Sequence, residues 1–224
     1  MYRVRLVRLE REEALPRDPA GLIAGRIVAA AALRRLCGLP SDATNAYRLV
    51  NSEGDGLSGL TVDRFGSVLV VQESALWAQV HRAAVERALL AVVPGSSLVF
   101  RISPAIAREE GLDAPPAAAA VGTHLVRENG LAFAVTPDSG QKTGFFCDQR
   151  DNRGLVRRLA AGRTVLDAFC YSGGFALNAA AGGATSVLGV DSSQSAVETA
   201  IANATANGLD VAFEARDALQ VLES

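Results

Sequence analysis

The sequence predicts an α/β protein in which an α+β module precedes a parallel sheet. A helical pattern near the N-terminus is followed by short β-like runs separated by glycine-rich turns. In the last third of the chain, strand patterns alternate with helix patterns, which is typical of βαβ units. The 224 residues, 49% of them hydrophobic, have room for one large domain or two small ones, each with its own core.

The N-terminal residues predict a short strand and then a long helix. Residues 1–10 alternate apolar residues with arginines, which indicates a partly exposed strand. Residues 18–40 carry apolar residues at helical spacing, and Asp18 is placed to cap the helix N-terminus. Gly38 and Pro40 are expected to end this helix.

Residues 44–136 predict an α+β module. The runs YRLV, LTVD and SVLVVQ favour a small antiparallel sheet, and SSLVFRIS favours a further strand. Residues 75–95 predict one amphipathic helix that ends at Pro94 and Gly95. After a Pro/Ala loop over residues 113–122, Asn129-Gly130 predicts a type I′ hairpin within residues 124–137.

The last third predicts three strands that alternate with three helices. The expected helices cover residues 148–162, 174–184 and 193–209, and the expected strands cover residues 163–169, 186–191 and 211–218, the first of them buried. Ligands of such sheets bind outside the carboxyl ends of the strands, where Gly173, Asp191 and Asp217 fall.

The turn AFCYSGGF is a candidate nucleotide-binding turn. An acidic residue that ends the next strand, Asp191, is placed to accept hydrogen bonds from both ribose hydroxyls, and Asp217 to reach an adenine amino group. The turn lacks GxGxxG, and Asp167 would repel a pyrophosphate while suiting a cationic amino-acid group. These residues favour S-adenosylmethionine (SAM) over NAD as the cofactor. A turn that merely packs strand against helix is the alternative.

The charge of the chain excludes a broadly basic nucleic-acid surface. The formal net charge is −2, so any basic patch must be local. Four arginines recur at helical spacing at positions 150, 153, 157 and 158. They are candidates for RNA phosphate contacts, but a solvated helix face is equally compatible with the pattern, and Arg150 is also a candidate for the cofactor.

Other features point away from metal and membrane chemistry. Cys37, Cys147 and Cys170 are scattered without a CxxC pair or a nearby histidine, so we expect three buried thiols and neither a metal site nor disulfides. No apolar run is long enough to span a bilayer, and residues 1–10 lack the apolar core of a signal peptide. We therefore expect a cytoplasmic protein without a membrane partner.

Three motifs carry a resemblance to a known family. In order and spacing, YRLVNSEGDGLSGLTVDRFG, QKTGFFCDQRDNR and VLDAFCYSGGFAL resemble the SAM-dependent 23S ribosomal RNA cytosine-C5 methyltransferases, the RlmI-like group. The resemblance implies that residues 1–43 are the remnant of a PUA-like RNA-binding domain with a linker helix. It implies a central α+β domain over 44–136 and the first half of a Rossmann-like class I methyltransferase domain over 137–224. Ribosomal RNA (23S) is the implied partner.

The resemblance also implies a cofactor site. Phe145, Gln149 and Arg150 would lie beside SAM, and the segment from Asp167 to Phe175 would hold its methionine part. Asp191, with Ser192 beside it, would bind the ribose, and Asp217 would lie near the adenine. The implied site residues in the turn are Asp167, Phe169, Ser172, Gly173, Gly174 and Phe175.

The sequence departs from the family at its end. The strand that carries Asp-Pro-Pro-Lys-Phe in the family and the later cysteine nucleophile do not occur in the 224 residues. Methylation at cytosine C5 needs a thiolate that adds to C6, so we assign no catalytic residue and expect this chain alone not to methylate RNA. We also expect an uncovered strand edge at TVLDAF, which favours a less stable C-terminal third and a homodimer.

Two other functions stay open at this point. One is a non-catalytic RNA-binding protein derived from the same family, which would crosslink to RNA without methylating it. The other is a Rossmann-like oxidoreductase, which titration with NADH against SAM would distinguish.

Overall fold

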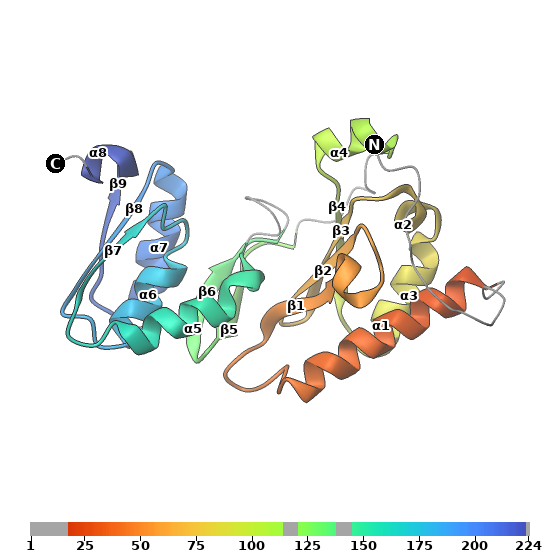
Figure 1. The fold of residues 1–224 in the computed structure, drawn as a ribbon, viewed down its shortest axis with the longest axis horizontal. Helices are drawn as coiled ribbons and strands as arrows, with labels where there is room; N and C mark the ends of the chain where they lie inside the picture. Colours follow the sequence, from red (N-terminus) through yellow and green to blue (C-terminus); the bar gives the residue numbers. More distant parts are fainter. Residues whose placement is uncertain (1–17, 114–120, 138–144, 223–224) are drawn as a thin grey trace. The chain divides into compact units, whose positions relative to one another are not determined.

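A computed structural model describes residues 18–113, 121–137 and 145–222, which form two compact units (Figure 1). The first unit takes in residues up to 41, residues 45–122 and the stretch that begins at 136. The second unit takes in residues 42–44, 123–135 and those from 145 onward. The strand expected over residues 1–10 and most of the Pro/Ala loop lie outside the described residues.

The first unit is built on a four-stranded sheet with the order β1-β2-β3-β4. Its strands are β1 (Ala46–Asn51), β2 (Leu60–Phe65), β3 (Val68–Glu73) and β4 (Ser97–Arg101). The first three pair antiparallel as the sequence predicts, and β4 joins β3 in parallel. A crossover between parallel strands needs a connecting element, and the helical segment between β3 and β4 supplies it.

Helices complete the first unit, and the predicted caps are confirmed. The helix α1 (Pro19–Leu36) begins where the Asp18 carboxylate accepts hydrogen bonds from the backbone N–H groups of Ala20 and Gly21, both at 3.0 Å. The helix expected over 75–95 is two helices that meet at His81. The remaining helices of this unit are α2 (Leu76–Val80), α3 (Arg82–Val92), the 3₁₀ turn η1 (Ser52–Asp55) and α4 (Pro104–Glu110).

The second unit contains a parallel sheet with the order β7-β8-β9, as the alternating pattern predicts. Its strands are β7 (Thr164–Ala168), β8 (Ser186–Asp191) and β9 (Ala212–Ala215). Its helical elements are η2 (Cys147–Gln149), α5 (Arg150–Leu159), α6 (Gly174–Ala181), α7 (Gln194–Ala206) and the short α8 (Ala218–Leu222). The strand β7 forms one edge of this sheet and is less buried than predicted, because the side chain of Leu166 is 41% exposed.

A hairpin of β5 (His124–Glu128) and β6 (Leu131–Val135) belongs to the second unit. Its turn is the predicted one, with positive φ at Asn129 and Gly130. The outer edge of β6 is satisfied by asparagine side chains in and just after α7: Asn207, the C-cap, exchanges two hydrogen bonds with the backbone of Ala132, at 2.8 and 2.7 Å. The sequence-based division assigns this hairpin to the central module, whereas these contacts attach it to the second unit.

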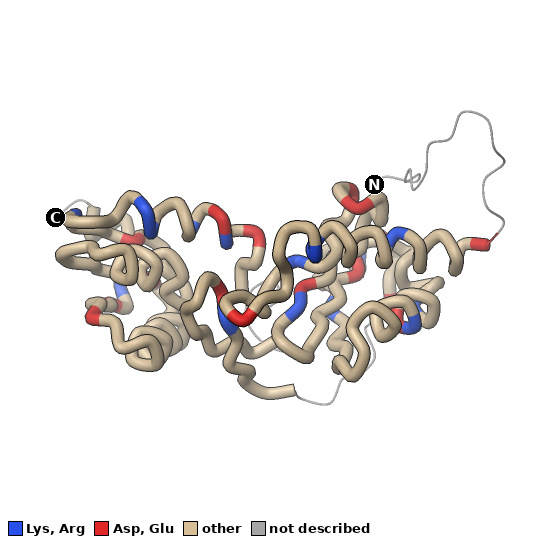
Figure 2. Tube along the Cα trace, turned by 90° about the horizontal axis from the view of Figure 1, so that it is seen from below, with Lys and Arg blue, Asp and Glu red and all other residues tan. Residues whose placement is uncertain are grey.

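Charged positions of both signs are interspersed along the two units (Figure 2). In the first unit, buried acids pair with arginines: Arg48 Nε lies 3.0 Å from Asp63 Oδ1, and Arg82 Nη2 lies 2.5 Å from Glu73 Oε2. Among the helices that the structure describes, none combines the length and the apolar character that a bilayer-spanning segment needs.

Candidate functional site

The acidic residues predicted to hold a ligand lie at the carboxyl ends of the parallel strands. Asp167 is paired in register with Gly189, two residues before Asp191, and Asp191 ends β8 opposite Ala215 of β9. Asp217 follows β9, is exposed, and accepts a hydrogen bond from the backbone N–H of Leu219 at 2.9 Å. The fold therefore brings Asp167 and Asp191 together at one end of the sheet.

The turn between β7 and α6 has an unusual backbone. Phe169, Tyr171 and Gly173 have positive φ values of 64°, 49° and 82°. A Cβ added to Gly173 would lie 2.8 Å from the Leu177 side chain and 3.1 Å from Ala200 Cβ, and the positive φ adds backbone strain to any larger residue. Non-glycine residues at positive φ cluster at ligand-binding sites, and this turn contains two within three positions.

Asp191 holds this turn from the neighbouring strand. Its Oδ2 accepts a hydrogen bond from the backbone N–H of Tyr171, and its Oδ1 accepts one from that of Ser193, both at 2.9 Å. A carboxylate oxygen has two lone pairs, so each oxygen retains capacity for a further donor such as a ribose hydroxyl. Asp191 is thus both an anchor of the turn and a candidate ligand group.

Asp167 is the most perturbed carboxylate of the site. Burial is the main cause that raises its pKa to about 6, a hydrogen bond from the backbone N–H of Ala176 at 2.8 Å opposes the rise, and the nearby charge of Asp191 adds to it. A carboxylate held partly desolvated in this way gains much from a cationic partner. The sequence prediction that this mouth suits a cationic group fits this environment.

The thiol of Cys170 is not poised for nucleophilic attack. The pKa of this buried thiol is raised to about 12 by desolvation and by the charges of Asp167 and Asp191. Because the thiolate is the nucleophile, Cys170 is inert near neutral pH. Cys147 is buried as predicted, but Cys37 is exposed, since it follows α1 as its C-terminal cap instead of facing the core.

Buried side chains pack against one another next to the turn between β7 and α6. Phe145 is 2% exposed, its ring centroid is 5.0 Å from that of Phe133, and the Arg153 guanidinium lies 4.6 Å from its centroid and 5.9 Å from that of Phe175. A Cβ on Gly174 would lie 3.0 Å from Arg153 Cδ. The predicted site residues Phe145, Gly174 and Phe175 therefore gather around one buried arginine.

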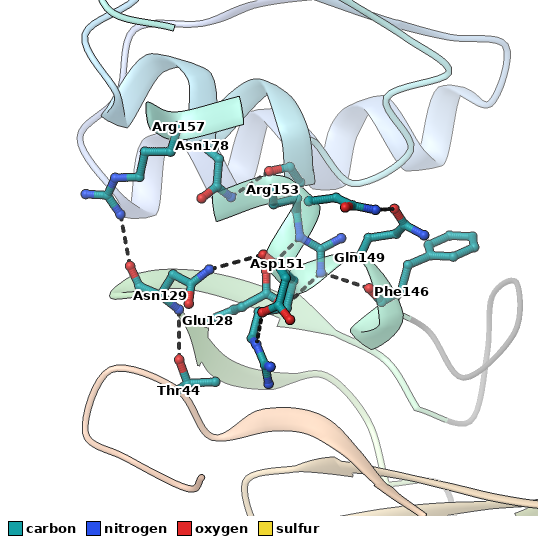
Figure 3. A network of polar contacts seen from close by, with 12 residues as sticks. Thr44, Glu128, Asn129, Phe146, Gln149, Asp151, Arg153, Arg157 and Asn178 are labelled. Carbon is teal, nitrogen blue, oxygen red and sulfur yellow. Dashed lines mark hydrogen bonds and ion pairs between the residues drawn. The ribbon is translucent and has the colours of Figure 1, made fainter. Parts of the chain in front are cut away.

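Arg153 and its partner Glu128 are residues whose role the sequence analysis missed. Two hydrogen bonds of 2.6 Å join their charged groups, and Arg153 also donates to the Phe146 carbonyl at 2.8 Å (Figure 3). Both side chains are buried, at 3% and 0% exposed. Helical spacing suggested a phosphate-contacting or solvated Arg153, and the structure shows instead that it points inward.

The other predicted residues are placed at the rim or beside the turn. Ser172 is buried, and its carbonyl accepts a hydrogen bond from Asn203 Nδ2 at 3.0 Å. Phe169 is 65% exposed, and Ser192 is also exposed.

Gln149 accepts a hydrogen bond from the Asn152 amide at 2.9 Å (Figure 3), and Arg150 pairs with Asp151 at 3.0 Å.

One ring contact connects the residue before η2 with the turn. The rings of Phe146 and Tyr171 meet edge to face, with centroids 5.5 Å apart. No group of three or more His, Cys, Asp or Glu side chains that could hold a metal ion occurs among the described residues. The arrangement offers carboxylates, backbone groups and aromatic rings, which suits a cationic nucleoside better than a metal.

Comparisons with known proteins agree with this chemistry. Residues 116–219 match the family model of S-adenosylmethionine-dependent methyltransferases. The ribosomal RNA large subunit methyltransferase I of Erwinia tasmaniensis is 39% identical over 193 residues, which cover 81% of this chain and 48% of that protein. The protein of the same name from Tolumonas auensis is 40% identical over 191 residues, with 80% and 47% covered. The chain spans about half the length of these relatives.

Two solved structures share the fold over nearly the whole chain. One, described as a SAM-dependent methyltransferase from Streptococcus mutans, superposes with a TM-score of 0.78 at 25% identity. The other, described as a methyltransferase complexed with SAH (S-adenosylhomocysteine), gives a TM-score of 0.79 at 26% identity. Each comparison covers 95% of this chain and 56% or 55% of the solved chain.

Proposed function

We propose that this chain, which is homologous to the ribosomal RNA large subunit methyltransferases I over about four fifths of its length, holds the cofactor-binding part of a SAM-dependent methyltransferase that acts on 23S ribosomal RNA. One observation carries the proposal. The turn with positive φ values lies beside Asp167 and Asp191, at the carboxyl ends of β7 and β8. The names of the relatives support ribosomal RNA as the partner.

The residues of the site fit SAM group by group. The amino-acid part of SAM carries an ammonium group, which the partly desolvated carboxylate of Asp167 would bind. Asp191 has accepting capacity for the ribose hydroxyls, with Ser192 beside it, and exposed Asp217 is available for the adenine amino group. Gly173 adopts the positive φ of the turn, Gly174 packs against Arg153, and Phe169 offers an exposed ring.

The bound cofactor would supply an electrophilic methyl group on a sulfonium centre. The role of this chain is to bind and orient that group. The packing of Arg153 on Phe145 would help to keep the turn rigid. The chemistry at the base needs a nucleophile; Cys147 and Cys170 are both buried, and the raised pKa of the Cys170 thiol does not suit that role.

Titration calorimetry with SAH tests the cofactor proposal. We expect wild-type protein to bind SAH, and Asp191→Asn to bind more weakly by about 1 to 3 kcal/mol, because one accepting oxygen for the ribose becomes a donor. Asn retains one oxygen that can accept from a backbone N–H, so the turn is less disturbed than by alanine. Asp210→Asn is the matched control, since Asp210 is an exposed acid of the same unit that precedes β9 and so lies away from the carboxyl ends of the strands.

Equal SAH affinity in wild type and Asp191→Asn would contradict this assignment of Asp191. Titration with NADH under the same conditions tests the oxidoreductase alternative. We expect no NADH binding, because the charge of Asp167 opposes a pyrophosphate.

A further inference from the structure

We infer that a pocket on the outer face of α5 binds phosphate groups of the RNA backbone, an inference that deepens the proposed function and rests on it. The pocket has a volume of about 430 Å³ and lies wholly within the second unit. It is lined by Asn129, Arg150, Asp151, Gly154, Arg157 and Arg158. None of these residues belongs to the strand ends where the cofactor is proposed to bind, and Arg150 is the one lining residue that the family resemblance also assigns to the cofactor.

The sequence of α5 creates this pocket through helical geometry. Positions 150, 154, 157 and 158 share one side of the helix, and Arg153, a neighbour of Arg150 and Arg157 at the edge of that side, turns its side chain into the core to pair with Glu128. Gly154 has no side chain to fill the space between the arginines. A Cβ at that position would lie 3.6 Å from Asn129 Nδ2 and 3.8 Å from Arg158 Nη1. These groups therefore converge on the open space above the glycine.

The arginines keep donors free for a ligand. Arg157 donates one hydrogen bond to the Asn129 carbonyl at 3.0 Å (Figure 3), and Arg150 donates from Nε to Asp151 at 3.0 Å. A guanidinium has five N–H donors, so each of these side chains retains several. Within the described part of the chain, the side chain of Arg158 has no ion pair or hydrogen-bond partner.

The charge of the pocket contrasts with the charge of the chain. Three guanidinium groups and one carboxylate give the lining a net charge of +2, whereas the whole chain carries −2. The carboxylate belongs to Asp151, whose side chain is 86% exposed, so its pairing with Arg150 is weak. Such a cluster on an acidic protein attracts an anion locally.

The chemistry of the lining favours phosphate over other anions and over bases. The planar guanidinium fork matches two phosphate oxygens, and three forks around one pocket suit adjacent or shared phosphates. The lining contains no aromatic side chain on which a base could stack. The pocket is therefore a site that positions an RNA strand without reading its sequence.

Fluorescence anisotropy with a short labelled RNA, performed on the whole chain, tests this inference. We expect Arg158→Gln to weaken RNA binding about tenfold and to reduce the slope of log affinity against log salt by roughly 0.7 to 1, because one phosphate contact is lost. We expect Asp151→Asn to tighten binding about threefold, because it removes the one negative charge of the pocket. A gain in affinity cannot result from misfolding.

Matched control variants distinguish an effect of the pocket on RNA affinity from an effect of the net charge of the chain. Arg163→Gln and Asp210→Asn make the same charge changes at exposed positions of the second unit that do not line the pocket. We expect both to change affinity less than twofold. RNA affinity of Arg158→Gln equal to that of Arg163→Gln, or of Asp151→Asn equal to that of Asp210→Asn, would overturn the inference.

SAH titration of the same variants distinguishes a failure of the pocket proposal from a failure of the cofactor proposal. SAH binding that is unchanged in Arg158→Gln, with weakened RNA binding, supports both proposals. SAH binding in every variant without any effect on RNA affinity refutes only the pocket. The reverse result, normal effects on RNA and no SAH binding even in wild type, refutes the cofactor proposal and leaves the pocket standing.

Discussion

Asp167 lowers the stability of the fold in order to keep a carboxylate near the ligand site. Its pKa is raised from 3.8 to about 6, so the folded state binds its proton more tightly than the unfolded chain does. At neutral pH, where this carboxyl is ionised, its burial therefore destabilises the folded state.

Replacing Asp167 by Asn should stabilise the protein at pH 7 by about 1 to 3 kcal/mol, because the amide carries no charge and can still accept the hydrogen bond from Ala176. The gain should shrink as pH falls through 6 toward 4, since wild-type Asp167 then takes up its proton. Chemical denaturation at several pH values measures this difference. The same variant should lose SAH affinity at pH 7, and a variant that is neither more stable nor weaker in binding would contradict the role of Asp167.

The positions and roles of some single residues can be predicted from the sequence, and those of others cannot. Asp167, Gly173 and Asp191 could be placed because a strand, a glycine turn and a second strand fix their positions locally. The role of Arg153 could not, because its partner Glu128 lies on a hairpin 25 residues away and helical spacing alone does not show which face is buried. Cys37 was assigned to the core from residue type, and it lies beyond the last turn of α1.

At the scale of elements, α5 separates two kinds of arginine. The arginines at 150, 157 and 158 line the pocket, whereas the neighbouring Arg153 turns inward to Glu128 of β5. This buried ion pair, together with the asparagines of α7, holds the hairpin against the second unit. The helix is thus a support of the ligand turn and a candidate RNA surface at the same time.

Arg153→Met should destabilise the second unit by about 3 to 5 kcal/mol, because the Glu128 carboxylate remains buried without its partner. The double variant Arg153→Met with Glu128→Gln should recover part of this loss. Denaturation monitored by circular dichroism measures both, and Arg158→Met serves as the exposed control on the same helix. A double variant as unstable as the single one would show that packing on Phe145, and not the charge, dominates.

The elements that the sequence did not reveal are short. The 3₁₀ turn η1 and the helices α4 and α8 have four to seven residues, and the helix expected over 75–95 breaks at His81. Short helices have too few residues for a periodic pattern and depend on tertiary contacts. The longer helices and every strand predicted within the described residues are present, because their patterns extend over whole elements.

At the scale of the whole molecule, the division into two units follows contacts that are distant in sequence. The hairpin is continuous in sequence with the central module, yet its edge pairs with α7, some 70 residues later. No local pattern shows such pairing, whereas the parallel order β7-β8-β9 follows from the alternation of elements. The expected homodimer stays a prediction.

We expect the 224-residue chain by itself not to methylate RNA. The described cysteines of the second unit are buried, and the pKa of Cys170 is raised to about 12, so Cys170 offers no thiolate near neutral pH to add to C6 of cytosine. Incubation with tritiated SAM and unmodified ribosomal RNA measures incorporation. Label in cytosine that disappears in Cys170→Ala or Cys147→Ala would refute this expectation, and crosslinking to RNA without label would favour a binding role.

Asn207, which hydrogen-bonds to the edge of β6, is a site of slow chemical change. Asn207 precedes Gly208, and asparagine side chains are thermolabile, most of all before glycine, where the amide hydrolyses to a carboxylate. Hydrolysis would replace the Nδ2 group that donates to the carbonyls of Ala132 and Asn203, both at 2.7 Å, by an oxygen that repels them. Hydrolysis at Asn207 would thus weaken the attachment of the hairpin that carries Glu128, the buried partner of Arg153.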